Sequence, residues 1–183
     1  LNPGLKMLIR LGVSFPAAYC TIGLWYALLW YAITFLRNVL VDVVSAKGFA
    51  VREWSWRDIN FENATQSLFW TGFSVPLLNL VKVKIDVLLA LSCFGPGIVR
   101  EFVRFFAICI ANGLYISGHN RLRNFDGAVI RANFFRSVLA WPLAASFSFV
   151  GNFLLIPSIV QAKLWSDFVA ALIEGVGKYR HHL

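Results

Sequence analysis

The chain has 183 residues, of which 58% are hydrophobic, 16% aromatic and 14% charged, and its mean hydropathy is +0.67. Soluble domains carry about a quarter charged residues, so this composition excludes an ordinary water-soluble domain and predicts an integral membrane protein of a bacterial inner or an organellar membrane. The net charge is +8. A nucleic-acid-binding domain needs a soluble basic face, and the sequence has none, so the basic excess predicts anionic lipid headgroups or an acidic protein partner.

The first predicted element is an uncharged apolar segment from Leu11 to Leu36. It exceeds the roughly 20 residues that a helix needs to cross a bilayer. Lys6 and Arg10 precede it, and Arg37 closes it. We expect it to be the clearest of four membrane spans.

A polar segment follows, and its Trp-rich segment, VREWSWRDINF at residues 51–61, places two tryptophans among charges. That mixture is typical of chain lying in the membrane interface. Asn63 with Gln66 three residues later resembles a capping box, which predicts that the next helix opens at Asn63.

We expect the second span over residues 64–93 and the third over residues 98–118. The Gly-Pro-Gly sequence at 95–97 predicts a tight turn between them. A rival interpretation divides the second span into two half-helices near Lys82.

Charged residues gather around that turn. Lys82 and Asp86 lie four residues apart, on one helix face, and can neutralise each other. Ionisable groups inside a membrane mark functional sites. The alternative, which we favour, is that the lysines extend to the headgroups. The whole candidate charge cluster comprises Lys82, Lys84, Asp86, Arg100, Glu101 and Arg104.

A second basic region, the arginine stretch, runs from His119 to Arg136 (HNRLRNFDGAVIRANFFR). Arginine forks bind phosphate oxygens in a bidentate manner, so the stretch predicts a site for anionic lipid headgroups or a phosphorylated ligand. The alternative, which we favour, is that its arginines only anchor helix ends or pair with acidic residues of a partner. Asp126 is expected to cap a helix that starts at Gly127 and continues into the fourth span. The candidate ligands are Arg121, Arg123, Arg131 and Arg136.

The fourth predicted span covers residues 137–160 and contains Pro142, Gly151 and Pro157. Prolines are tolerated in membrane helices where neighbours satisfy the backbone groups that they leave unpaired. The tail, residues 163–183, has an apolar stripe at helical spacing, which predicts an amphipathic helix in the interface.

No constellation for catalysis, metal or cofactor binding is recognisable, so we predict no catalytic residue, no metal and no cofactor. Ser117-Gly118-His119 resembles one motif of the membrane phosphatidic-acid phosphatases, but the lysine-arginine motif and the second histidine with its aspartate are missing. The three cysteines lie in separate apolar stretches and predict no disulfide.

The sequence therefore predicts an all-α polytopic integral membrane protein, with a transmembrane helical domain at 1–162 and the interfacial tail at 163–183. The leading hypothesis is a non-catalytic, accessory subunit of a larger membrane complex that contacts other subunits, or its own copies, and binds anionic lipid through the arginine stretch. The second is a transporter or channel protomer that uses Lys82, Asp86 and the Gly-Pro-Gly break. The weakest is a lipid-modifying enzyme built on His119 and Asp126.

The sequence does not determine the orientation of the chain in the membrane. With four spans, nine lysines and arginines fall on one face and eight on the other, so the positive-inside rule does not choose between them. The sequence starts with Leu1 and leaves open whether it is part of a longer polypeptide.

Overall fold

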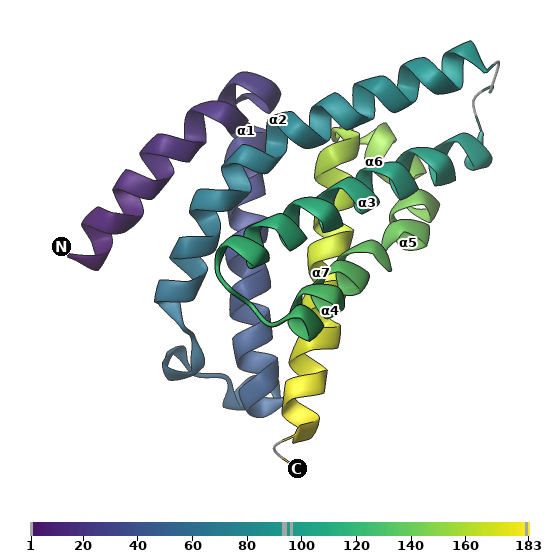
Figure 1. Cartoon of the computed structure of the whole chain (residues 1–183). Helices are drawn as coiled ribbons and strands as arrows, with labels where there is room; N and C mark the ends of the chain where they lie inside the picture. Colours follow the sequence, from purple (N-terminus) through teal and green to yellow (C-terminus); the bar gives the residue numbers. More distant parts are fainter. Residues whose placement is uncertain (1, 93–94, 96, 182) are drawn as a thin grey trace. The chain divides into compact units, whose positions relative to one another are not determined.

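The computed structural model describes residues 2–92, 95, 97–181 and 183, and all its regular secondary structure over these residues is helical (Figure 1). The all-α prediction is therefore confirmed. The chain falls into two compact units, the first formed by Leu1–Phe73 with Asp167–Leu183 and the second by Ser74–Ser166.

The first unit begins with α1 (Pro3–Lys47), whose N-cap Asn2 accepts a hydrogen bond from the Gly4 amide at 2.9 Å. This helix is bent, because Gly23 has non-helical torsion angles of φ 81° and ψ 175°. Figure 1 shows the two arms of α1 meeting at a sharp bend. The apolar segment that we predicted as one span is thus helical on both sides of Gly23 but not straight.

Side chains from both arms of α1 meet near α2 (Phe61–Leu91). The Ser14 and Tyr31 hydroxyls lie 2.6 Å apart across the bend. The Trp30 indole N–H donates to the carbonyl and hydroxyl oxygens of Thr71 on α2, at 3.0 Å each. A Cβ at Gly72 would contact the Tyr31 hydroxyl and lie 2.7 Å from the Ser14 carbonyl oxygen. Gly72 therefore allows the α2 backbone to approach both arms.

The Trp-rich segment forms two 3₁₀ turns, η1 (Val51–Glu53) and η2 (Trp56–Asp58), before α2. Trp56 is 76% exposed and stacks on Phe61. The predicted start of the next helix is wrong by a few residues: α2 begins at Phe61, and the Asn60 side chain accepts from the Asn63 amide at 3.1 Å. Asn60 is therefore the capping residue, and Asn63 lies in the first turn.

The C-terminal part of α7 (Ser158–His181) completes the first unit. Asp167, 2% exposed, pairs with Arg37 of α1 at 2.9 Å. A Cβ at Gly175 would lie 2.8 Å from the Cβ of Val44, so this glycine lets α7 approach α1 closely. The predicted tail helix exists, but it begins at Ser158, before Lys163.

The second unit contains α3 (Ile98–Leu122), α4 (Gly127–Val138), α5 (Trp141–Ser146) and α6 (Ser148–Phe153). α3 packs against α4 and α5. Phe102 and Phe106 meet the Trp141 ring edge-on, and Gly113 leaves room for Phe134. Residue 96 of the predicted Gly-Pro-Gly turn, and residues 93 and 94 just before the turn, lie outside the described residues.

The predicted fourth helix over residues 137–160 is not continuous. Residues in this range form the end of α4, then α5, α6 and the first turn of α7, with Leu155 at a left-handed φ of 59° before Pro157. α4 starts at Gly127 as predicted, but the Asp126 side chain makes no capping hydrogen bond. Among the described helices, α1 is the one long and apolar enough to cross a membrane by length and composition.

Candidate functional site

The structure brings together four of the six residues of the predicted charge cluster, all within the second unit. Asp86 on α2 lies at the centre, 3.0 Å from the Lys82 ammonium and 2.8 Å from Nε of Arg104 on α3. Nη1 of Arg104 also lies 3.1 Å from a Glu101 carboxylate oxygen. The side chains are 13% to 33% exposed, so two cations and two anions neutralise each other in a half-buried network.

Helix geometry explains which residues join the network. Lys82 and Asp86 are four apart, and Glu101 and Arg104 are three apart, so each pair shares a helix face. Lys84 lies two residues beyond Lys82, on another face, and is exposed. Nε of Arg100 is buried and makes no hydrogen bond to the described part of the chain.

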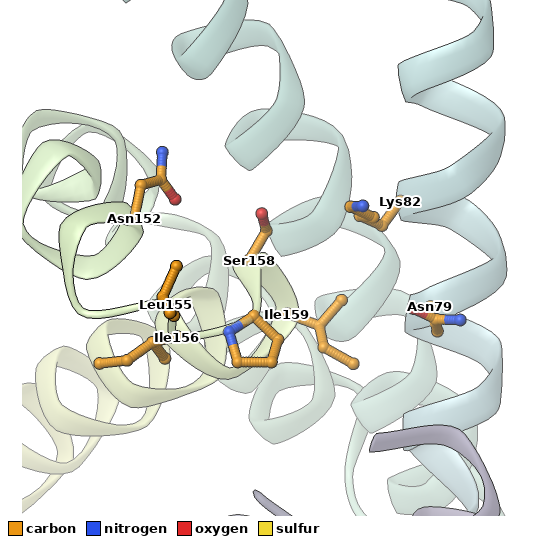
Figure 2. Close-up of a pocket in the computed structure, with 8 residues that line it drawn as sticks. Asn79, Lys82, Asn152, Leu155, Ile156, Ser158 and Ile159 are labelled. Atoms are coloured by element: carbon orange, nitrogen blue, oxygen red, sulfur yellow. The ribbon is translucent and has the colours of Figure 1, made fainter. Parts of the chain in front are cut away.

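A pocket adjoins this network, with a volume of about 290 Å³. Lys82 contributes to both features. Figure 2 shows Asn79 and Lys82 on α2, facing the chain that joins α6 to α7 across the pocket. The lining residues are Asn79, Lys82, Asn152, Leu155, Ile156, Pro157, Ser158 and Ile159. The pocket thus combines a cation, two amides and a hydroxyl with apolar walls.

The far wall of the pocket is the break between α6 and α7, and Gln161 stabilises it. The Gln161 side chain is 4% exposed and donates to the Ile156 carbonyl at 2.8 Å and to the Asn152 amide oxygen at 3.1 Å. A Cβ at Gly151 would collide with Gln161, so the glycine makes room for the amide. The Ile156 carbonyl lies at the break between the helices, and a side chain rather than a backbone amide donates its hydrogen bond.

Sequence reasoning missed Gln161, Asn152 and Ser158. One signal was present: Gln161 is a polar amide that follows Pro157 within a largely apolar stretch, where an interrupted helix needs a donor.

The arginine stretch occupies the end of α3, the α3–α4 connection and α4. Arg121 and Arg131 are exposed, and an Arg131 guanidinium nitrogen lies 3.6 Å from the Cβ position of Gly127 at the start of α4. The Arg123 guanidinium lies 5.0 Å from the centre of the Phe125 ring, and Arg136 donates to Asn133 at 3.2 Å. Arg123 and Arg136 are thus held by local contacts, and Arg121 and Arg131 are exposed.

His119 lies at the end of α3, beside Arg123. Burial and the positive charge of Arg123 lower the pKa of His119 from 6.5 to about 4, so its imidazole is neutral near pH 7. The pKa of Arg123 is itself lowered by burial. Within the described ranges, histidines, cysteines and acids do not gather in a group of three that could hold a metal ion.

Comparison with protein-family models, curated proteins and solved structures finds no match to this chain. The charge cluster, the pocket and the arginine stretch are therefore interpreted from their own chemistry.

Proposed function

We propose that the chain is a polytopic integral membrane protein, with about four membrane-crossing segments, that acts as a non-catalytic, accessory subunit of a larger membrane complex. In this role its helices pack against partner helices, and the arginine stretch binds anionic lipid headgroups. The C-terminal part of α7 lies in the membrane interface.

One observation carries the proposal: large apolar side chains are exposed on every long helix. Water solvates such side chains poorly, and many large exposed apolar side chains are typical of surfaces that contact lipid or protein. Examples, all more than half exposed, are Leu8, Trp25, Leu36, Leu80, Leu91, Ile98, Leu114, Phe135, Phe153 and Leu155.

The charge network supports an accessory role. Lys82, Asp86, Glu101 and Arg104 neutralise one another, which is what a structural ion-pair network requires. The arginine stretch supplies the lipid contact, because Arg121 and Arg131 are exposed and a guanidinium binds a phosphate with two parallel hydrogen bonds.

The test is purification in mild detergent followed by native mass spectrometry of the intact particle. We expect fixed protein partners or further copies of the chain, together with bound anionic phospholipid. The double variant Arg121→Gln/Arg131→Gln should lose most of that lipid, whereas the matched double variant Arg52→Gln/Arg57→Gln, at exposed positions of the first unit, should retain it. A lipid-free monomer in the unsubstituted protein would contradict the proposal.

A transporter or channel protomer is the second candidate, and the pocket beside Lys82 favours it. Transporters bind substrate and coupling ions where helices are interrupted at membrane depth, and the α6–α7 break forms one wall of this pocket. Flux measured in proteoliposomes separates the two functions. A transporter would lose flux with Lys82→Ala or Asp86→Ala and keep it with Lys84→Ala; an accessory subunit would show no flux of its own to lose.

A further inference from the structure

The bend of α1 depends on the backbone of Gly23. Its torsion angles, φ 81° and ψ 175°, fall in a region that essentially only glycine adopts. Every other residue of α1 keeps helical torsion angles. The bend is therefore confined to one position, and the chain is a regular helix on both sides of it.

The two polar ends of the apolar segment meet on one turn of α2. Before the segment, Arg10 reaches Glu62 and Thr65, both at 3.5 Å. After it, the Asn38 side chain accepts from the Asn63 amide group at 3.2 Å. In a straight helix, Arg10 and Asn38 would lie about 42 Å apart. Contacts to the same turn of α2 require instead that the chain doubles back.

The tip of the bend is apolar and exposed. Trp25 is 80% exposed, and Tyr19, Leu24, Leu28 and Leu29 are each 41% to 50% exposed. Along a helix, Gly23 lies about 20 Å from Arg10 and about 21 Å from Arg37, whereas the hydrocarbon core of a bilayer is about 30 Å thick. Each arm of the uncharged apolar segment is thus long enough to bring the tip deep into hydrocarbon and too short to bring it to the far headgroups.

Contacts behind the tip hold the arms together. The Ser14–Tyr31 hydroxyl pair lies between the arms, and the Phe15 and Tyr31 rings stack with centroids 6.0 Å apart. Gly72 of α2 lies against both Ser14 and Tyr31. The two hydroxyl groups between the arms are therefore paired with each other, which favours burial of this part of the hairpin in lipid.

We propose that the segment from Leu11 to Leu36 is a re-entrant hairpin that enters the lipid from one membrane face, with Lys6 and Lys47 on that same face. The surface at its tip contacts lipid acyl chains. The inference rests on the proposed membrane function and revises it at one point: the first of the four proposed crossings becomes a segment that enters and leaves the membrane on the same face.

The test uses the full chain expressed in a bacterial inner membrane, with Cys20, Cys93 and Cys109 replaced by serine. Single cysteines at Lys6→Cys and Lys47→Cys are exposed to a membrane-impermeant maleimide, first with intact cells and then after lysis. The hairpin predicts one result for both positions, either both labelled or both protected before lysis. One labelled and one protected would overturn it.

Glycine variants test the hinge. Gly23→Ala places a strong helix former where only glycine fits the bend, which favours a straight helix. In a measurable fraction of the molecules, residues 6 and 47 should then lie on opposite membrane faces, and Lys6→Cys and Lys47→Cys should label differently. Gly12→Ala is the matched control, because a Cβ there meets nothing within 4 Å, and it should label as the parent does. An unchanged pattern in Gly23→Ala would overturn the role of Gly23 as the hinge.

Alkaline carbonate extraction separates this inference from the proposed function. Release of the chain from the membrane would contradict the membrane function itself. Retention with split labelling would contradict the hairpin alone.

Discussion

At the scale of single residues, close backbone approach explains why particular glycines are required. Gly72 lies where α2 contacts the Ser14 backbone and the Tyr31 hydroxyl. Gly72→Ala should therefore force α2 away from both arms of α1 and lower the free energy of unfolding by about 1–3 kcal/mol, the usual cost of overpacking. Thermal unfolding followed by circular dichroism in detergent measures the change, with Gly12→Ala as the control. Equal midpoints for the two variants would contradict the contact.

Leu155 has a left-handed φ of 59° and is 82% exposed, so it carries backbone strain with little packing in return. Leu155→Gly removes a backbone strain of about 1–2 kcal/mol. Part of this stabilisation is offset, because glycine increases the conformational entropy of the unfolded chain. Its neighbour Leu154, 58% exposed with φ −81°, has no such strain. Leu155→Gly should therefore be more stable than Leu154→Gly by about 1–2 kcal/mol in the same unfolding assay. The reverse order would contradict the left-handed conformation.

His119 predicts a pH dependence. Its folded-state pKa is lowered to about 4 from the usual 6.5. Between these values the unfolded chain binds a proton that the folded chain does not, so stability is complete above pH 6.5 and falls as the pH drops toward 4. The melting midpoint should decrease from pH 7.5 to pH 5, and His119→Gln should reduce that decrease. His181→Gln, at the exposed end of α7, should leave it unchanged. An undiminished decrease in His119→Gln would assign the effect to other groups.

Sequence reasoning reached some residues of the site and not others, for physical reasons. The Lys82–Asp86 pair follows from helix spacing, and the reach of Arg104 to Asp86 was anticipated across the Gly-Pro-Gly turn. Gln161 was not found, because its role depends on a break in the helix that periodicity does not reveal. Helix starts were misjudged where two asparagines, Asn60 and Asn63, compete to cap the same helix.

At the scale of elements, Arg104 joins α3 to α2 within the second unit. Arg104→Ala removes its hydrogen bonds to Asp86 and Glu101 together and leaves the Glu101 carboxylate without that partner. Hydrogen bonds to charged groups contribute about 1.5–3 kcal/mol each, and partial exposure places the expected loss near the lower figure. Lys84→Ala, at an exposed cation of α2 outside the network, should change the unfolding midpoint little. Equal effects would show that the network contributes nothing to stability.

Elements were predictable where one physical rule dominated. The apolar run of α1 and the breaker after α2 are strong local signals. The stretch 137–160 was predicted as one helix because apolar composition alone does not distinguish a long helix from several short ones. Pro142 and Pro157, with Gly151 between them, favour the interruptions, and the contacts of Gln161 stabilise the second break.

At the scale of the whole molecule, the exposed apolar surface predicts behaviour in solution. Removal of detergent should aggregate the purified chain, and transfer into lipid nanodiscs should keep it dispersed, because acyl chains cover the same side chains that water solvates poorly. Size-exclusion chromatography with light scattering measures both states. A monodisperse particle without detergent or lipid would contradict membrane embedding.

The proposed hairpin at Gly23 also determines which cations share a membrane face. A segment that turns back does not invert the side on which the following chain emerges, so under this proposal Lys6 and Arg10 lie on the same face as Lys47 and the Trp-rich segment. The end of α7 belongs to that face as well, because a Cβ at Gly48 would lie 2.9 Å from the Tyr179 ring. All eight lysines and arginines of the first unit would then lie on one face, which the positive-inside rule assigns to the cytoplasm. In that topology, one glycine sets the side on which the basic ends of the first unit emerge.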